Sequence, residues 1–248
     1  MSKIYIYHHL GLGDCFMCHG IIRTNARIYD QVITFAKPAY IETVRYMYRD
    51  LANVLVIAMD DAEVLQYLNT VNRNDVLCIG YLGKDWNTVY AGQGDVVKLD
   101  EMFYRQAELP LSVKWDAFYI SRDMDAEMEL FNRFREKSNI QEGKYIFIHD
   151  ANKKAYDGFF RGDIGDGLDL NHIEDKSLPV IEPESIKFNM CHYIYLLENA
   201  AEIHVMNSSF LNLIELINPK GKLFYHVYPR PGDCLRSRKP WIKLLERT

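Results

Sequence analysis

The residues of this sequence that can bind phosphate or move a proton gather in a few short stretches. The first is Ile-Tyr-Ile-Tyr-His-His-Leu-Gly-Leu-Gly-Asp, residues 4–14, which predicts a buried strand, a tight turn at Gly11 and Gly13, and a helix directly after it. Glycines permit a sharp turn and close approach of a ligand to the backbone. The start of a helix presents N–H groups and positive dipole character. Asp14 then stands at the mouth of a cleft, where a general base is useful.

This glycine turn does not match the common nucleotide-binding fingerprints. A dinucleotide-binding G-x-G-x-x-G needs a third glycine at position 16, where the chain has Phe16. The sequence contains no G-x-x-x-x-G-K-[ST] phosphate loop either. The turn is therefore interpreted as part of another kind of substrate site or as a purely structural junction between strand and helix.

A second stretch, residues 202–215, also predicts a strand followed by a polar helix start. Asn207, Ser208 and Ser209 stand between an apolar strand and a helix with apolar residues at Phe210 and Leu213. Asn and Ser are preferred helix caps, so capping alone explains them. Together with the N–H groups of the helix, however, three small polar side chains form a pocket suited to a diphosphate.

Weaker candidates lie elsewhere along the chain. His149 ends a predicted strand and is followed in the next loop by Lys153, Lys154 and Arg161. The carboxyl ends of parallel strands face the ligand crevice, so His149 is expected to donate to a phosphate or a sugar hydroxyl, or else to be an ordinary hydrogen-bonded residue. Arg105 can bind phosphate through two N–H groups or pair with a carboxylate of the protein.

The sequence Cys15-Phe-Met-Cys18-His19 spells a haem-attachment motif, yet we expect neither haem nor metal there. Haem attachment requires export, and a zinc site needs a second ligand pair that the other cysteines do not supply. The acidic pairs Asp60-Asp61 and Asp123-x-Asp125 stand at predicted helix starts, where capping explains them. No metal and no cofactor are expected.

The elements that must position these residues alternate between strand and helix. We expect strands at Lys3–His8, Gln31–Ala36, Val54–Ala58, Val76–Gly80, Tyr145–His149, Pro179–Ile181, Glu202–Met206 and Leu223–Val227. We expect helices at Cys15–Tyr29, Ala39–Asp50, Asp61–Val71, Asp100–Ala107, Asp125–Glu136, Ile186–Asn199, Ser208–Ile217 and Lys239–Glu246. Strands of Val, Ile and Leu without polar alternation are typical of a parallel sheet covered on both faces. The sequence thus predicts two successive α/β halves that meet between Pro110 and Glu142.

Composition excludes several classes of protein. The chain has 248 residues, 48% of them hydrophobic and 25% charged, which suits one large or two small α/β domains. A net charge of −5 argues against a general nucleic-acid-binding surface. No apolar run approaches the ~20 residues that cross a bilayer, and no signal-peptide core precedes the first strand. We expect a cytoplasmic protein with no transmembrane segment and reduced cysteines.

Several motifs, in order along most of the chain, resemble the GT-B glycosyltransferases. The resemblance is to heptosyltransferases and related bacterial or viral polysaccharide transferases. The similar stretches are His8-His9-Leu-Gly-Leu-Gly-Asp14, Asp100-x-x-Phe-Tyr-Arg-Gln-Ala107, Tyr145-x-Phe-x-His-Asp150 and Glu202-Ile-His-x-x-Asn-Ser-Ser-Phe210. Compared with those transferases the chain is compact, and position 15 is Cys where they often carry His or another polar residue.

The resemblance implies a fold of two Rossmann-like domains whose parallel sheets face a central cleft. The first domain, residues 1–122, would bind the acceptor through His9, Gly11, Gly13 and Arg105. The second, residues 123–238, would bind a nucleotide sugar, with Asn207, Ser208, Ser209, His149, Lys153 and Arg161 on its diphosphate. A C-terminal helix, residues 239–248, would pack back on the first domain.

The implied activity is metal-independent transfer of a sugar from a nucleoside-diphosphate sugar to a glycan hydroxyl, with Asp14 as the base. Two alternatives remain open at this point, a sugar-nucleotide epimerase of the same fold and a non-catalytic carbohydrate- or nucleotide-binding module. The nucleotide, the sugar, the acceptor, the stereochemical outcome and the oligomeric state are not specified by the sequence.

Overall fold

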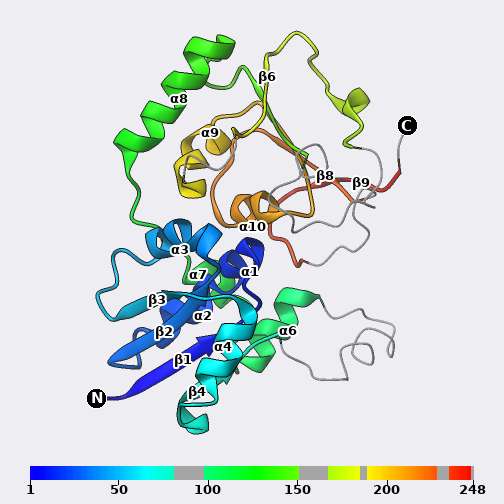
Figure 1. The fold of residues 1–248 in the computed structure, drawn as a ribbon. Helices are drawn as coiled ribbons and strands as arrows, with labels where there is room; N and C mark the ends of the chain where they lie inside the picture. The colour runs from blue at the N-terminus through cyan, green and yellow to red at the C-terminus, as the bar shows by residue number, and fades with distance from the viewer. Residues whose placement is uncertain (81–97, 151–166, 185–188, 228–234, 247–248) are drawn as a thin grey trace. The chain divides into compact units, whose positions relative to one another are not determined.

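The computed structural model describes residues 1–80, 98–150, 167–184, 189–227 and 235–246 (Figure 1). The described chain divides into two compact units. Unit 1 contains the residues up to Ser121 together with Leu235 and Arg236, and unit 2 contains those from Arg122 to Val227 and from Ser237 to Glu246.

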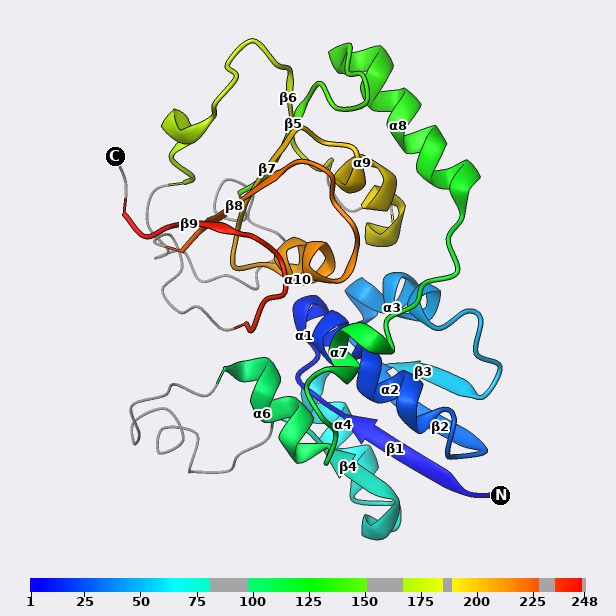
Figure 2. The ribbon, with the colours of Figure 1, turned by 180° about the vertical axis from the view of Figure 1, so that it is seen from behind.

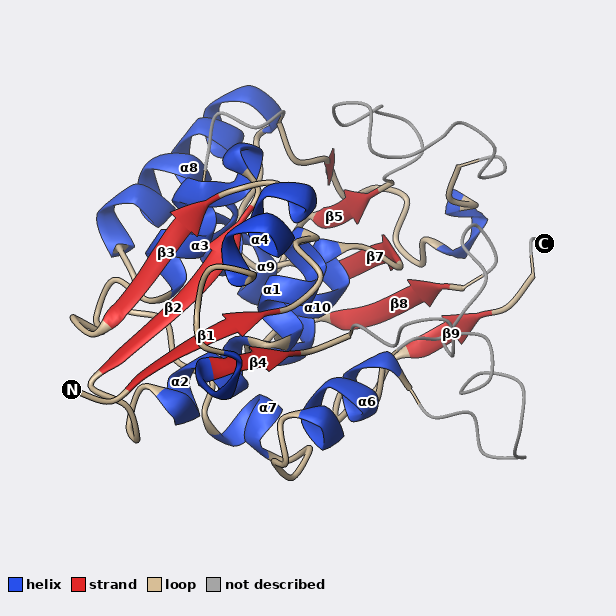
Figure 3. Cartoon of the chain, turned by 60° about the horizontal axis from the view of Figure 1, so that its bottom comes forward, coloured by secondary structure: helices blue, strands red, loops and turns tan. Residues whose placement is uncertain are grey.

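Unit 1 is built on a parallel four-stranded sheet in the order β3-β2-β1-β4 (Figure 3). The strands are β1 (Lys3–Tyr7), β2 (Gln31–Ala36), β3 (Val54–Ala58) and β4 (Val76–Cys78). The α-helices of this unit are α1 (Leu12–Met17), α2 (His19–Asn25), α3 (Ile41–Met47), α4 (Asp61–Leu68), α6 (Leu99–Gln106) and α7 (Val113–Asp116), with short 3-10 turns η1 (Pro38–Tyr40) and η2 (Arg73–Asp75). Side chains of β1 and β2, among them Tyr7 and Phe35, pack on Val64 and Leu68 of α4 to form one apolar core.

The helix expected after the glycine turn is interrupted. It was expected over Cys15–Tyr29, but α1 begins earlier, at Leu12, and a turn at Cys18 separates it from α2. At this break the Tyr104 hydroxyl donates a 3.1 Å hydrogen bond to the Met17 carbonyl, which a continuous helix would use internally. Gly20 leaves no room for a β-carbon, because the Val113 carbonyl oxygen would lie 2.4 Å from it. Contacts with α6 and α7, remote in sequence, therefore decide the shape of this helix.

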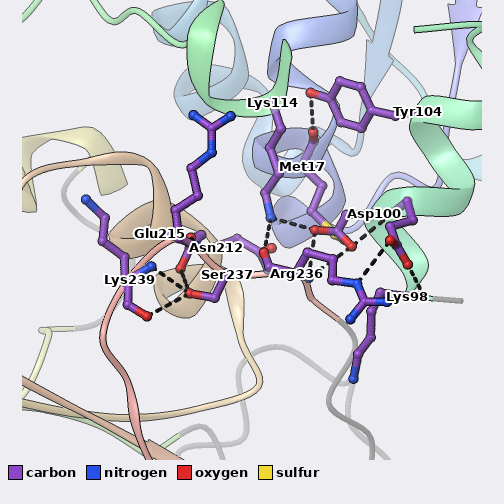
Figure 4. Close-up of polar contacts among 12 residues, drawn as sticks. Met17, Lys98, Asp100, Tyr104, Lys114, Asn212, Glu215, Arg236, Ser237 and Lys239 are labelled. Atoms are coloured by element: carbon purple, nitrogen blue, oxygen red, sulfur yellow. Dashed lines mark hydrogen bonds and ion pairs between the residues drawn. The ribbon is translucent and has the colours of Figure 1, made fainter. Parts of the chain in front are cut away.

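A buried ion pair fixes the return of the chain to unit 1 (Figure 4). Lys114 and Asp100 are almost fully buried, and the Lys114 Nζ lies 2.6 Å from the Asp100 carboxylate. The same two side chains hold the backbone of Arg236: the carboxylate accepts its N–H and the ammonium donates to its carbonyl oxygen. Among the described residues, Leu235 and Arg236 return to unit 1, whereas the tail from residue 239, which was expected to pack on the first domain, belongs to unit 2.

Unit 2 contains a parallel five-stranded sheet in the order β6-β5-β7-β8-β9. The strands are β5 (Ile146–His149), β6 (Val180–Ile181), β7 (Glu202–Met206), β8 (Lys222–His226) and β9 (Ile242–Leu244). Its helices are α8 (Met124–Ser138), α9 (Ile194–Glu198) and α10 (Ser209–Leu216), with 3-10 turns η4 (Leu170–His172) and η5 (Met190–Tyr193). The helix expected over Ile186–Asn199 is, in its described part, a 3-10 turn at Met190–Tyr193 continued by the short α9.

The two faces of the unit 2 sheet are covered differently (Figure 2). On one face Phe147 contacts the rings of Tyr193 and Phe210, which belong to the helical cover. On the other face Ile146 and Ile148 pack against the irregular segment 168–178. That segment is held by polar contacts as well, since the Glu202 carboxylate accepts two of its backbone N–H groups, each at 3.3 Å.

The tail forms a strand in place of the expected helix. β9 pairs in parallel with β8, and it is reached through a turn that the buried Glu215 carboxylate holds (Figure 4). Glu215 accepts hydrogen bonds from the Ser237 hydroxyl, the Arg238 N–H and the Trp241 indole N–H. The prediction of a tail helix was wrong because three long-range hydrogen bonds and the open edge of β8 decide the conformation of a weakly patterned segment.

Candidate functional site

Both sheets contain a position at which the strand order reverses. In unit 1 the chain proceeds from β1 to β2 and β3 on one side and then places β4 on the other side of β1. In unit 2 it proceeds from β5 to β6 and then places β7 on the other side of β5. Ligands of open α/β sheets bind outside the carboxyl ends of the strands at such reversals. The carboxyl ends of β1 with β4 and of β5 with β7 are therefore the candidate ligand-binding positions of the two units.

At the reversal in unit 2, the structure brings together two residues that are 59 positions apart. The His149 Nδ1, at the end of β5, lies 3.0 Å from the Ser208 Oγ, which follows β7. The His149 ring also packs on the Phe210 ring, with 4.6 Å between their centroids. The imidazole is almost fully buried, while Asn207, Ser208 and Ser209 are partly exposed.

Ser208 precedes α10 but does not cap it. Its side chain makes no hydrogen bond to the first turn of the helix, because the hydroxyl is directed to His149 instead. The N–H groups of a first helical turn have no partners within the helix, and together they attract anions. The start of α10, which the Ser208 side chain does not cap, thus meets a serine–histidine pair at one corner of the sheet. Lys153 and Arg161 lie outside the described residues.

Asp150 has a structural contact beside this corner. Its carboxylate accepts the N–H of Leu168 at 2.8 Å, which fixes the irregular segment against the end of β5. His149 and Asp150 are adjacent in sequence but act in different directions, one toward Ser208 and one toward Leu168.

At the reversal in unit 1, the Asp14 carboxylate folds back over Gly11. A β-carbon built on Gly11 would lie 2.5 Å from Asp14 Oδ2, so the missing side chain of Gly11 provides the space for this carboxylate. Gly11 has ordinary extended backbone angles and precedes α1, whereas Gly13 and Asp14 lie in its first turn. The need for glycine at position 11 is therefore steric, and it concerns Asp14.

His9 bridges the two strands at this reversal. Its Nε2 lies 2.8 Å from the carbonyl oxygen of Gly80, so this nitrogen carries the proton and donates. Gly80 has a φ of 79°, which favours glycine, and its N–H donates to the Gln106 side chain at 2.6 Å. Arg105, one position before Gln106 on α6, is exposed, and its positive charge is one of the contributions that lower the pKa of Glu101.

Three further polar side chains at the same edge were not identified from the sequence as site residues. The buried Lys37 follows β2, and its ammonium lies 3.1 Å from Asp61 Oδ2 at the start of α4. The Tyr7 hydroxyl donates to Asp61 Oδ1 at 3.1 Å. The sequence signal for this group was the position of Lys37, a charged residue directly after an apolar strand. The pairing of Lys37 with Asp61 cannot be predicted from the sequence, because 24 positions separate the two residues.

Asp60 and Asp61 were both attributed to helix capping, and the structure places Asp60 at the N-cap of α4. In this position the backbone N–H of Asp60 donates to the Glu63 carboxylate at 2.8 Å. Capping therefore accounts for Asp60 but not for Asp61.

The cysteine–histidine motif belongs to the core of unit 1. Cys15, Cys18 and His19 are fully buried, and burial raises the pKa of both thiols, which keeps them protonated. The His19 ring packs between Tyr48 and Phe118. Within the described ranges, no cluster of three His, Cys, Asp or Glu side chains is arranged to hold a metal ion.

The fold is therefore an α/β fold with two parallel sheets. A solved structure with a similar fold is the glycosyl transferase family 9 protein from Veillonella parvula DSM 2008, with a TM-score of 0.57. The alignment covers 100% of this chain and 88% of that chain at 9% sequence identity, so the likeness concerns the fold. No protein-family model and no curated protein matches the sequence. Among the described helices, none is long and apolar enough to cross a membrane.

Proposed function

We propose that this protein is a glycosyltransferase that moves a sugar from a nucleoside-diphosphate sugar to a hydroxyl of a glycan acceptor, without a metal. The observation that carries the proposal is the corner where His149 meets Ser208 at the start of α10, with the Ser208 hydroxyl directed to His149 and not to the helix. At this corner, hydrogen-bond donors lie beside the positive end of a helix dipole, at the position where the strand order of unit 2 reverses. The similar fold of a family 9 glycosyltransferase agrees with this assignment.

In the proposed reaction, unit 2 binds the donor. The diphosphate is held by the first-turn N–H groups of α10 and by Ser208, Ser209 and Asn207, and His149 donates to it. As the glycosidic bond to the diphosphate breaks, negative charge develops on the leaving group. Hydrogen-bond donors fixed in advance stabilise that charge more than water does.

Unit 1 supplies the base. Asp14 accepts the proton of the acceptor hydroxyl while that oxygen attacks the anomeric carbon, and the leaving diphosphate departs from the same carbon. A positioned base contributes about 10²–10⁴-fold to the rate of such a step. The fold of Asp14 over Gly11 fixes the carboxylate before the substrate arrives.

The test is product analysis with Asp14→Asn, which retains the size of the side chain. Wild-type protein is incubated with each nucleoside-diphosphate sugar, with and without glycan acceptors, in the presence of EDTA. Transfer to an acceptor that falls at least about 100-fold in the variant supports the proposal. Conversion of the donor without any acceptor would indicate an epimerase, and binding without turnover would indicate a carbohydrate- or nucleotide-binding module.

A further inference from the structure

Asp61 is a fixed and accessible carboxylate at the carboxyl edge of the unit 1 sheet. Its Oδ1 accepts the Tyr7 hydroxyl and its Oδ2 is paired with Lys37, each at 3.1 Å. The carboxylate side chain is 43% exposed, whereas the Lys37 side chain is 10% exposed. Two contacts from β1 and from the end of β2 thus orient a carboxylate that still faces solvent.

Stability alone is a poor reason for this arrangement. Lysine is rarely buried, and an ion pair to a carboxylate that stays partly in water offsets the cost of burying its ammonium only in part. The start of α4 does not use the Asp61 carboxylate either, since Asp60 occupies the N-cap position and the Glu63 carboxylate accepts its N–H. A ligand that uses the oriented oxygens of Asp61 would account for both observations.

We propose that Asp61 binds a pair of neighbouring hydroxyl groups on a neutral sugar, and that Lys37 and Tyr7 hold it in position. A carboxylate has about four acceptor directions, and the contacts with Tyr7 and Lys37 use two of them. The remaining two lie on different oxygens of one rigid group, which matches the spacing of adjacent hydroxyls on a sugar ring. Hydrogen bonds to an ionised acceptor are also among the stronger ones.

The charges at this edge favour a neutral ligand over an anionic one. Lys37 is neutralised by Asp61, and the imidazole of His8, which lies in the electrostatic reach of Asp61, is uncharged because burial lowers its pKa to about 4. The described residues that follow β1 and β3 include the further carboxylates Asp14, Asp60 and Glu63. A phosphate or carboxylate on the ligand would be repelled by this set.

This inference rests on the proposed function in one respect, because it assigns the bound sugar to the acceptor of the transfer reaction. Sugar binding itself is measured without turnover. The probes are the neutral methyl glycosides of mannose, galactose and glucose, with glucuronate and glucose 6-phosphate as anionic counterparts. Affinities are measured by saturation-transfer NMR titration of the full-length protein.

Two variants separate binding from folding. Asp61→Asn removes the charge, and Asp61→Glu keeps a charge for Lys37 but displaces the oxygens by one methylene group. The matched control is Asp75→Asn, which makes the same change in the same unit. Asp75 directly precedes β4, so it lies at the amino ends of the strands and not at their carboxyl ends. Thermal unfolding of each variant checks that unit 1 remains folded.

We expect at least one neutral glycoside to bind the wild type. Its affinity for both Asp61 variants should be at least about tenfold lower, because this is the loss typical of a hydrogen bond to a charged group. The Asp75 control should bind like the wild type. The inference is overturned if no neutral glycoside binds the wild type, if either folded Asp61 variant binds it equally well, or if the anionic sugars bind more tightly. Nucleoside diphosphates are titrated in parallel, because their failure to bind would refute the proposed function while leaving the sugar site intact.

Discussion

Acid should destabilise unit 1 well before its carboxylates are protonated, because two of its histidines are buried in the neutral form. Burial lowers the pKa of His8 from 6.5 to about 4. Burial and the neighbouring Arg23 charge lower the pKa of His19 from 6.5 to about 3. Both imidazoles are almost inaccessible to water in the folded state.

The sign follows from proton linkage. Between the folded and unfolded pKa values the unfolded chain binds more protons, so the free energy of unfolding decreases as the pH falls below about 6.5. At pH 5 each histidine lies about 1.5 pH units below its unfolded pKa, which costs about 2 kcal/mol per residue. The two residues together remove about 4 kcal/mol between pH 7 and pH 5, a large share of the 5–15 kcal/mol of a typical domain.

The assay is urea unfolding at pH 7, 6 and 5, followed by circular dichroism and by hydrogen exchange in peptides of β1 and β2. His19→Phe keeps a ring between Tyr48 and Phe118 and removes one titrating group. The variant should lose about 2 kcal/mol less than the wild type between pH 7 and pH 5. An identical pH dependence in the two proteins would refute the assignment of this acid sensitivity to buried histidine.

Two further predictions follow from the packing of unit 1. Lys114→Met should lower the free energy of unfolding by about 3–5 kcal/mol in urea titrations, because it leaves Asp100 buried without its cation. Adding Asp100→Asn should restore part of the loss, and an unchanged stability in the single variant would contradict this role of Lys114. Gly11→Ala should retain the melting temperature but lose transfer activity as Asp14→Asn does, because the new methyl group displaces the Asp14 carboxylate. Full activity in this variant would show that the position of Asp14 is not critical.

The sequence predicted the strands better than the ends of the helices. The ranges expected for β2, β3 and β7 agree with the structure residue for residue, because apolar runs bounded by polar residues are typical of parallel strands. The break at Cys18 and the tail strand β9 were missed. Both depend on partners remote in the sequence, Tyr104 in one case and Glu215 in the other.

The candidate site was only partly visible in the sequence. Local patterns identified Ser208 and His149 as separate candidates, and the strand order is what brings them within 3.0 Å. Local patterns also assigned Asp61 to capping, because a helix start explains an aspartate without reference to the rest of the chain. Its contacts with Tyr7 and Lys37 arise only when three strands are placed side by side.

The central claim is that the corner formed by His149 and Ser208 binds a diphosphate, and nucleotide titration tests it most directly. UDP, GDP, dTDP, CDP and ADP are titrated into the wild type with EDTA and with Mg²⁺, by calorimetry and thermal shift. One of them at about 100 times its Kd should stabilise unit 2 by about 2.7 kcal/mol without metal, and Ser208→Ala with His149→Ala should abolish the effect. Binding that survives in the double variant, or no binding by any of the five, would contradict the claim.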